Sequence, residues 1–191
     1  NNPRVFPKSR RLRMQNNILI ALCKANFVQN NEQKEYFPKF IRKKTFVLPN
    51  PVNEELLHCE RENREIKNIV TLGRLSEQKN QEMLISAFSI IANKHPNTKL
   101  TIYGKGEKQK QLENCIEKMG LSERVKLAGV TNNVKDVLIK SDLFVMTSNF
   151  EGMPNALIEA MATGLPCIST DCPTGPSDLI NNKSNGLRIK M

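Results

Sequence analysis

The sequence predicts an α/β fold in which a doubly wound parallel sheet of about six strands carries helices on both faces. Short apolar runs alternate with amphipathic stretches from about Asn68 onward, and three of these runs are closed by a glycine. The runs are apolar on both faces, which is typical of parallel strands that are covered by crossover helices on either side. Loops that follow such strands all lie at one edge of the sheet, where ligands bind.

Each of the first five expected strands leads into an expected helix, and a sixth strand follows the last helix. The strands are expected over 69–72, 100–103, 125–127, 143–146, 166–169 and 186–189. Asn80 is expected to cap the first helix, which Pro96 ends. Further helices are expected over 112–119, 134–139 and 156–162, with another beginning at Pro176.

The first fifty residues do not follow this alternation. Their expected elements are a helix over 18–25, a strand beginning at 27–28, a helix over 32–40 and a strand over 46–48. Pro49-Asn50-Pro51 forms a rigid turn. We therefore place a boundary there, between residues 1–50 and a domain of residues 51–191.

The charge of the chain favours contact with polyanions. Net charge is +10, and 39% of the 191 residues are hydrophobic, as in ordinary soluble proteins. Five basic residues lie within the first thirteen, namely Arg4, Lys8, Arg10, Arg11 and Arg13. A solvated arm is the simpler interpretation, and contact with an anionic membrane or nucleic acid is the other. A basic nucleic-acid-binding module stays an alternative function, although the sequence has no Trp and no nucleic-acid motif.

The cysteine and histidine pattern predicts neither disulfides nor a metal site. The five cysteines include no Cys-x-x-Cys, and Cys23, Cys115 and Cys167 lie in apolar patterns. We expect these three to be buried, reduced thiols of a cytoplasmic protein. The two histidines, His58 and His95, lie far from any cysteine cluster, so no metal is expected.

A first candidate site is the loop from Gly73 to Asn80, between a strand and a helix. Arg74 offers a planar fork of donors and Lys79 a compact charge, and both suit phosphate oxygens. The helix N-terminus that follows is itself an anion site. The alternative is that both are surface cations flanking Glu77.

Two weaker candidates lie at the same edge of the sheet. Gly104-Lys105-Gly106 belongs to neither a GxGxxG fingerprint nor a Walker loop, because position 109 is Gln. A tight turn explains it equally well. The segment 171–176 follows the fifth strand and either shapes a pocket or forms a turn set by proline and glycine.

The strongest candidate runs from Glu151 to Glu159. Gly152 allows close approach of a ligand to the backbone, and Pro154 suits the first helical position. The amides of Gly152, Met153 and Asn155 then face outward at the positive end of a helix.

Two carboxylates flank these amides. Glu159 lies within an apolar helix, where a vicinal diol such as a ribose could satisfy its carboxylate. The alternative is that Glu159 pairs with a cation and Glu151 caps the helix.

These residues resemble a known family. Glu151 and Glu159, with seven residues between them, reproduce the Glu-seven-Glu motif of retaining glycosyltransferases of the two-domain GT-B type, specifically family four. The Gly73-Arg74 to Lys79 spacing is similar to that family's diphosphate-binding residues. Pro49-Asn50-Pro51-Val52 resembles its interdomain Pro-Asn-Gly-Val, with Pro in place of Gly.

The resemblance implies a Rossmann-like fold, the C-terminal half of a GT-B fold, and a role for each matched position. Gly73, Arg74 and Lys79 would meet the diphosphate of the donor, and Glu159 the ribose. Glu151 and the amides of Gly152, Met153 and Asn155 would hold the donor sugar and a phosphate oxygen. The base would lie near Val130 and Thr131. The catalytic residues would be Arg74, Lys79 and Glu151, with neither metal nor cofactor.

The resemblance also implies a missing half. Residues 1–50 match only the tail of an acceptor-binding domain, and the family usually continues beyond the sixth strand. We therefore expect this chain to bind a UDP-linked sugar but to transfer little of it. The expected acceptor is a glycan or lipid-linked molecule at the cytoplasmic face of a membrane. A non-catalytic interaction domain with the same fold is a third hypothesis.

Overall fold

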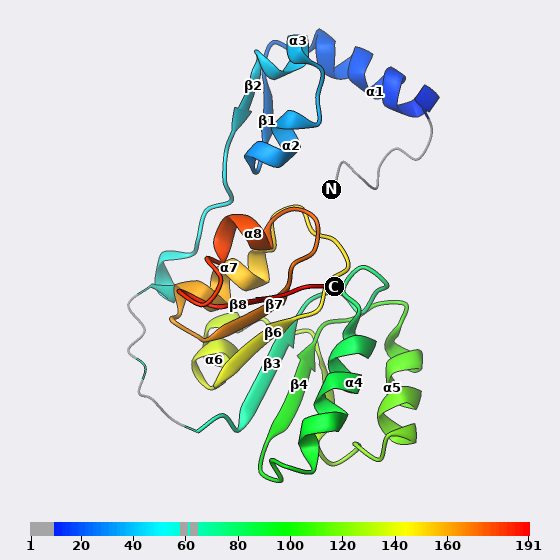
Figure 1. The fold of residues 1–191 in the computed structure, drawn as a ribbon, viewed down its shortest axis with the longest axis vertical. Helices are drawn as coiled ribbons and strands as arrows, with labels where there is room; N and C mark the ends of the chain where they lie inside the picture. Colours follow the sequence, from blue (N-terminus) through cyan, green and yellow to red (C-terminus); the bar gives the residue numbers. More distant parts are fainter. Residues whose placement is uncertain (1–9, 58–60, 62–64) are drawn as a thin grey trace.

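The computed structural model describes residues 10–57, 61 and 65–191. Figure 1 shows two parts, which we call the N-terminal part (residues 10–50) and the sheet domain (residues 65–191). None of the described helices is long and apolar enough to cross a bilayer.

The sheet domain contains six parallel strands. They are β3 (Asn68–Leu72), β4 (Lys99–Tyr103), β5 (Val125–Gly129), β6 (Leu143–Met146), β7 (Cys167–Thr170) and β8 (Leu187–Ile189). Their order across the sheet is β5-β4-β3-β6-β7-β8. The chain therefore starts in the middle, moves outward to β5, and returns to β6 on the other side of β3. The reversal between β3 and β6 is the switch point at which such sheets bind ligands.

Helices cover both faces of this sheet. They are α4 (Gln81–Ala92), α5 (Gln109–Lys118), α6 (Val134–Ile139), α7 (Asn155–Ala162) and α8 (Pro176–Leu179). Neighbouring residues of β3 point to opposite faces: Ile69 joins the core with Phe88 of α4, and Val70 joins the core with Leu157 of α7. Burying each such side chain contributes about 1.5–3 kcal/mol, so two cores hold the domain.

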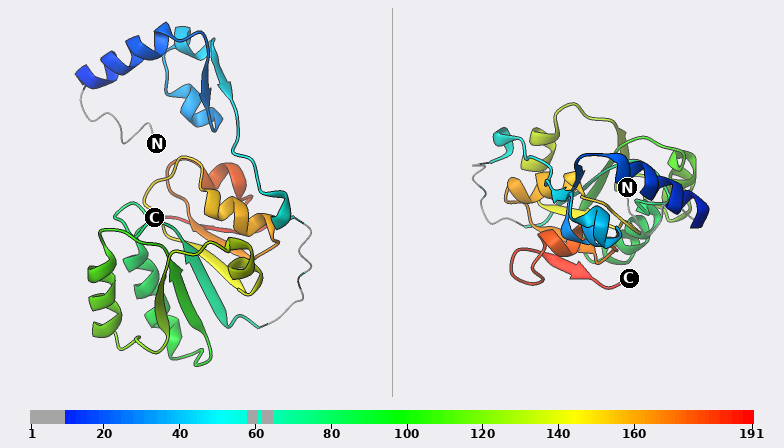
Figure 2. Two further views of the ribbon diagram at one scale, coloured as in Figure 1. Left: turned by 180° about the vertical axis from the view of Figure 1, so that it is seen from behind. Right: turned by 90° about the horizontal axis from the view of Figure 1, so that it is seen from above.

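The N-terminal part has a small sheet of its own. Its elements are α1 (Arg10–Leu22), β1 (Asn26–Val28), α2 (Asn31–Glu35), α3 (Lys39–Arg42) and β2 (Thr45–Val47). β1 and β2 pair in parallel, and a linker with the short helix η1 (Glu54–Leu56) leads to the sheet domain. Figures 1 and 2 show this part standing over the edge of the sheet domain where the strands end, next to α7 and α8.

The helix predicted over 32–40 is wrong. The structure has two helices there, α2 and α3, separated at Pro38. Proline cannot donate a helical hydrogen bond and disfavours helical geometry in the residue before it, so the first helix ends and Pro38 precedes the second. The helix predicted over 18–25 instead spans Arg10–Leu22.

Of the three thiols predicted to be buried, Cys167 is the one for which the prediction is confirmed. Cys167 is buried, and burial raises the pKa of its thiol to about 12, so it stays protonated. Cys115 is half-buried, whereas Cys23 is exposed because it follows the end of α1. Cys59, His58, Arg4 and Lys8 lie outside the described residues.

Arg61, which lies in a highly charged stretch of the linker, is half-buried. Its guanidinium donates to the carbonyl oxygens of Leu138 (2.5 Å), Ser141 (2.9 Å) and Thr163 (2.7 Å). Leu138 and Thr163 lie at the carboxyl ends of α6 and α7, where a positive charge is favoured by the helix dipoles. This linker residue thus holds the carboxyl ends of α6 and α7 together.

Candidate functional site

Two loops meet at the switch point, one after β3 and one after β6. The Asn149 amide donates to the Gln78 carbonyl (2.8 Å), and its side-chain amide donates to the Glu77 carbonyl (2.7 Å). Thr147 Oγ1 donates to the Asn80 carbonyl (2.9 Å). Three hydrogen bonds across about seventy residues of sequence make the two loops one unit.

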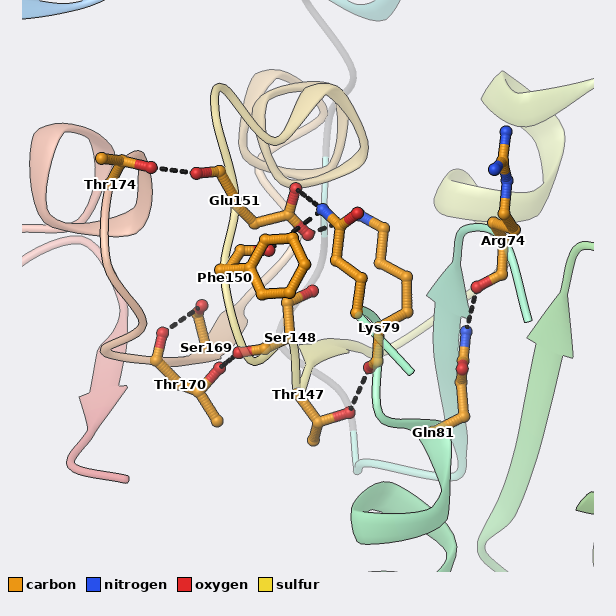
Figure 3. A network of polar contacts seen from close by, with 11 residues as sticks. Arg74, Lys79, Gln81, Thr147, Ser148, Phe150, Glu151, Ser169, Thr170 and Thr174 are labelled. Atoms are coloured by element: carbon orange, nitrogen blue, oxygen red, sulfur yellow. Dashed lines mark hydrogen bonds and ion pairs between the residues drawn. The ribbon is translucent and has the colours of Figure 1, made fainter. Parts of the chain in front are cut away.

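A buried ion pair lies between these loops. Lys79 Nζ is 2.6 Å from Glu151 Oε1, and the side chains are 19% and 6% exposed. Gln78 Nε2 donates to the Phe150 carbonyl (3.0 Å) and lies 3.4 Å from Glu151 Oε2. Figure 3 shows the Lys79 side chain rising from its loop to meet the carboxylate. Separating the two side chains would leave a buried charge without its partner, which costs several kcal/mol. The ion pair therefore holds both side chains in place.

Gly73 makes room for that lysine. A Cβ at position 73 would lie 3.1 Å from Lys79 Cε and 3.3 Å from Cδ, so the stem of Lys79 passes over the bare glycine. The Gly73 amide donates to the Tyr103 carbonyl (2.9 Å), which ties the loop to the neighbouring strand.

Arg74 is exposed, and within the described residues it makes no ion pair. Its backbone is nevertheless fixed, because the buried Gln81 donates Nε2 to the Arg74 carbonyl (2.8 Å). In Figure 3 its side chain extends from the loop in the same direction as that of Lys79. A fixed backbone with an unpaired guanidinium suits an arginine that awaits an anion.

The Gly104-Lys105-Gly106 turn supports this loop from below. A Cβ at Gly104 would lie 1.9 Å from the Gly73 carbonyl oxygen, and one at Gly106 would lie 2.2 Å from that of Leu75. The Leu75 amide also donates to the Lys105 carbonyl (3.1 Å). The turn therefore serves as a bare surface on which the Gly73–Leu75 backbone rests. The sequence pattern did not reveal this packing role.

The N-terminus of α7 faces the same edge. The helix begins at Asn155, so Pro154 lies one position earlier than predicted. Among the described residues, the amides of Gly152, Met153 and Asn155 donate no hydrogen bond. They are therefore available donors at the positive end of a helix.

The two glutamates of the motif differ in their surroundings. Glu151 pairs with Lys79 and does not cap α7, contrary to the alternative interpretation. Glu159 is half-buried, and desolvation raises the pKa of its carboxyl. No ion pair to Glu159 is found in the described part of the chain, so pairing with a cation receives no support.

Asn80 is not the side-chain cap that the sequence predicts. It precedes α4 with φ +47°, and its side chain makes no capping hydrogen bond. Instead, Asn80 Nδ2 donates to Asn149 Oδ1 (3.0 Å), on the opposite loop. Asparagine tolerates this left-handed conformation better than most residues. Its side chain therefore joins the two loops rather than capping the helix.

Val130 and Thr131 follow β5 at the same edge. Val130 is exposed, and Thr131 Oγ1 accepts from the Asn133 amide (3.1 Å). The preceding Gly129 carbonyl accepts from the Gly104 amide (2.7 Å), which attaches this loop to the turn under Gly73. The third loop thus lies beside the first two.

Several contacts of the site come from outside the two loops, and one of them comes from the segment 171–176 that the sequence placed at this edge. Thr174 Oγ1 donates to the Glu151 carbonyl. Asn30 Nδ2 donates to the Gly152 carbonyl (3.0 Å), and Asn50 Nδ2 to Asn155 Oδ1. Asn30 and Asn50 both belong to the N-terminal part. Sequence spacing could not have indicated the contacts of Asn30 and Asn50, which lie more than a hundred residues from their partners.

Potential metal ligands are scattered rather than clustered. In residues 10–57, 61 and 65–191, no three His, Cys, Asp or Glu side chains gather as a metal site would require.

Comparison with known proteins decides the family. Residues 53–191 match the family described as Glycosyl transferases group 1, which covers well over half of the chain. The chain belongs to this glycosyltransferase family. An uncharacterized glycosyltransferase of Methanocaldococcus jannaschii is 37% identical over 166 residues, 80% of this chain and 41% of that protein.

A second relative has a named activity. A UDP-Gal:alpha-D-GlcNAc-diphosphoundecaprenol alpha-1,3-galactosyltransferase of Escherichia coli is 37% identical over 123 residues, 63% of this chain and 32% of that protein. The chain thus spans less than half the length of these curated glycosyltransferases.

Solved glycosyltransferases share the fold. The pneumococcal O-GlcNAc transferase GtfA, solved with UDP and GlcNAc, superposes with a TM-score of 0.83 at 20% identity, over 95% of this chain and 37% of that one. HepE of Anabaena, solved with UDP, superposes with a TM-score of 0.81 at 21% identity, over 98% of this chain and 55% of that one. The predicted fold class, a doubly wound sheet forming the C-terminal half of a GT-B glycosyltransferase, is confirmed.

Proposed function

We propose that this group 1 glycosyltransferase chain binds a nucleoside-diphosphate sugar, with UDP as the nucleotide, and serves sugar transfer with retention of anomeric configuration. The observation that carries the proposal is the arrangement at the switch point. Arg74 and the Lys79–Glu151 pair lie on one loop unit with the unbonded amides at the start of α7. Cations and oriented amides together suit a diphosphate and the sugar attached to it.

Each residue then has a distinct task. Arg74 and Lys79 bind the diphosphate and stabilise the negative charge that develops on the departing nucleoside diphosphate. Glu151 holds Lys79 in place and, with the Gly152, Met153 and Asn155 amides, holds the sugar and a phosphate oxygen. These cations supply the charge that a metal ion provides in other transferases, so the proposal needs no metal and no cofactor.

The nucleoside occupies the neighbouring loops in this proposal. Glu159 accepts hydrogen bonds from the two ribose hydroxyls, which agrees with a half-buried carboxylate that has no ion-pair partner among the described residues. The base lies against Val130 and Thr131. GtfA and HepE were both solved with UDP, which supports uridine as the base.

We extend the proposal to the whole enzyme. Residues 1–50 belong to an acceptor-side domain and 51–191 to the donor side, and because the chain spans less than half the length of its curated relatives we expect it to transfer little sugar alone. The E. coli relative acts on a diphosphoundecaprenol-linked sugar and a Bacillus subtilis relative on poly(glycerol-phosphate). A lipid-linked or polymeric acceptor in cell-surface glycan synthesis is therefore proposed. The basic N-terminal residues would favour an anionic membrane surface on the cytoplasmic side.

Isothermal titration calorimetry with UDP, GDP and several UDP-sugars tests the donor site. Glu159→Ala should weaken UDP binding about 100-fold, because two hydrogen bonds to a charged group are lost. Glu117→Ala, which removes an exposed glutamate of α5, serves as the matched control and should bind as the original chain does. A turnover assay on the same samples should show little transfer.

Two results would speak against the proposal. Equal UDP affinity of the Glu159→Ala and Glu117→Ala variants would favour a non-catalytic interaction domain. Salt-dependent binding of DNA that exceeds the binding of every nucleotide-sugar would favour the nucleic-acid-binding module.

A further inference from the structure

Asn30 reaches the donor loop from the N-terminal part. It lies at the start of α2, is only 4% exposed, and uses both ends of its side-chain amide. The oxygen Oδ1 accepts from the Gln33 amide (2.8 Å) and caps α2. The nitrogen Nδ2 donates to the Gly152 carbonyl (3.0 Å), 122 residues away in sequence. One end therefore serves the helix and the other serves the loop.

The hydrogen bond from Asn30 to the Gly152 carbonyl also orients the amide of the following residue, Met153. In a planar trans peptide the C=O of one residue and the N–H of the next point in opposite directions. Holding the Gly152 carbonyl toward Asn30 therefore directs the Met153 N–H away from the N-terminal part. The backbone of Gly175 also lies close to the Gly152 carbonyl, since a Cβ added at position 175 would be 3.0 Å from its oxygen.

The preceding peptide is held in the same way from within the sheet domain. Thr174 Oγ1 donates to the Glu151 carbonyl, which directs the Gly152 N–H. Two successive amides of the loop are thus oriented through their partner carbonyls, one by the sheet domain and one by the N-terminal part. The Asn50–Asn155 hydrogen bond joins the same two parts next to it.

We propose that Asn30 is a positioning residue of the donor site, which orients the Met153 amide through the Gly152 carbonyl and makes the N-terminal part a component of that site. The inference rests on the proposed function, because the direction of the Met153 amide matters only if that amide holds the donor. It also implies reciprocity: donor binding and docking of the N-terminal part favour each other by the same factor.

Asparagine offers a substitution that separates the two roles of this side chain. Asn30→Asp keeps an oxygen that caps α2, since aspartate caps helices as well as asparagine does. It replaces the Nδ2 donor by an oxygen that faces the Gly152 carbonyl oxygen. Asn30→Thr also keeps a cap, is too short to reach Gly152 and adds no charge. Asn53→Asp is the matched control, because exposed Asn53 caps η1 in the same way without touching the donor loop.

The full chain and its three variants would be titrated with UDP-glucose by calorimetry at pH 7.5 and pH 5. At pH 7.5 we expect Asn30→Asp and Asn30→Thr to bind about tenfold more weakly than the original chain, and Asn53→Asp to bind equally well. At pH 5 a larger fraction of the introduced carboxyl is protonated than at pH 7.5, since burial favours its neutral form, and the protonated form regains a donor for Gly152. Asn30→Asp should then recover relative to the original chain, and Asn30→Thr should not.

The outcomes separate this inference from the proposed function. If the original chain binds no nucleotide-sugar, the proposed function fails and the inference fails with it. If the original chain binds and both Asn30 variants bind equally well at pH 7.5, only the inference is overturned. Weak binding by Asn30→Asp alone, with Asn30→Thr unaffected, would trace the loss to the added charge and would also overturn it. Thermal midpoints of the four proteins confirm that each is folded at both pH values.

Discussion

The sheet domain and the N-terminal part bury their aromatic side chains very differently. In the sheet domain, Phe88 and Phe144 lie at the centres of two cores on opposite faces of the sheet. In the N-terminal part, Phe27 and Phe46 face each other across β1 and β2, with ring centroids 6.0 Å apart, but remain 65% and 53% exposed. The sheet domain therefore covers these two aromatic side chains, whereas the small sheet leaves an apolar face exposed.

The residues of the candidate site therefore come from two parts of unequal stability. A two-stranded sheet is marginally stable in water. The N-terminal part therefore holds Asn30 in place less firmly. Lys79 and Glu151, in contrast, lie on loops anchored by a six-stranded sheet. We expect amide protons of β1 and β2 to exchange faster than those of β3 and β6.

The largest effect is expected when one phenylalanine in each part is replaced by alanine. Phe144→Ala should cost about 3–5 kcal/mol, because Phe144 is fully buried in the middle of β6. Phe46→Ala should cost less than about 1 kcal/mol, since half of its surface is already exposed. Urea unfolding of both variants measures the difference. Similar losses in the two would show that the N-terminal sheet is supported as firmly as the large one.

The second test extends the comparison from apolar groups to charges. Lys79→Ala should cost about 3 kcal/mol, because it leaves the buried Glu151 carboxylate without its partner. Lys67→Ala is the matched control, since Lys67 pairs with Glu65 at 3.2 Å on the surface, and it should cost about 0–1 kcal/mol. Adding Glu151→Gln to Lys79→Ala should recover part of the loss. No recovery would mean that the lysine contributes through its packing over Gly73 rather than through its charge.

A third test addresses the turn beneath the loop. Gly104→Ala should cost about 2 kcal/mol or more and weaken UDP binding, because its Cβ would collide with the Gly73 carbonyl and displace the loop that carries Arg74. Gly120→Ala is the control. Gly120 also has positive φ (+65°) but has nothing within 4 Å of a Cβ, so about 1 kcal/mol is expected and no change in binding. Equal effects of Gly104→Ala and Gly120→Ala on UDP affinity would show that the turn does not contribute to the site.

The sequence predicted the elements of the sheet domain more closely than those of the N-terminal part, and the physical reason is burial. Strands covered on both faces show as apolar runs, so β3 and β6 lie where the runs at 69–72 and 143–146 predicted them. In the N-terminal part, incomplete burial leaves no such pattern, and Pro38 divides the helix predicted over 32–40.

The location of the candidate site could be predicted from the sequence, but several of its contacts could not. Its placement at one sheet edge follows from loops that come after strands. The contact of Asn30 could not be read from spacing, because it depends on the docking of a segment 122 residues away, whereas Thr174 lies in the segment 171–176 that the sequence placed at the same sheet edge. Arg61 likewise lies in a charged stretch, and only the structure shows the helix ends that its guanidinium binds.

The smallest expected effect is also the one that separates stability from function within the sheet domain. Burial raises the pKa of Glu159 above its ordinary value of 4.5, so the ionised carboxylate weakens the fold at neutral pH. Glu159→Gln removes that charge and should raise the thermal midpoint at pH 7 by at most about 2 °C, since the group is only half-buried. The gain should shrink as the pH falls through the raised pKa toward 4.5, where the original carboxyl becomes neutral.

The same substitution should weaken UDP binding, because the amide accepts only one of the two ribose hydrogen bonds well. Thermal scans at pH 7 and pH 4, with and without UDP, measure both effects, and Glu117→Gln on the exposed face of α5 provides the control. A lower midpoint for Glu159→Gln at pH 7 would mean that Glu159 has a stabilising partner in the fold. A higher midpoint together with weaker binding would mean that the sheet domain gives up stability at this position in order to hold a ligand.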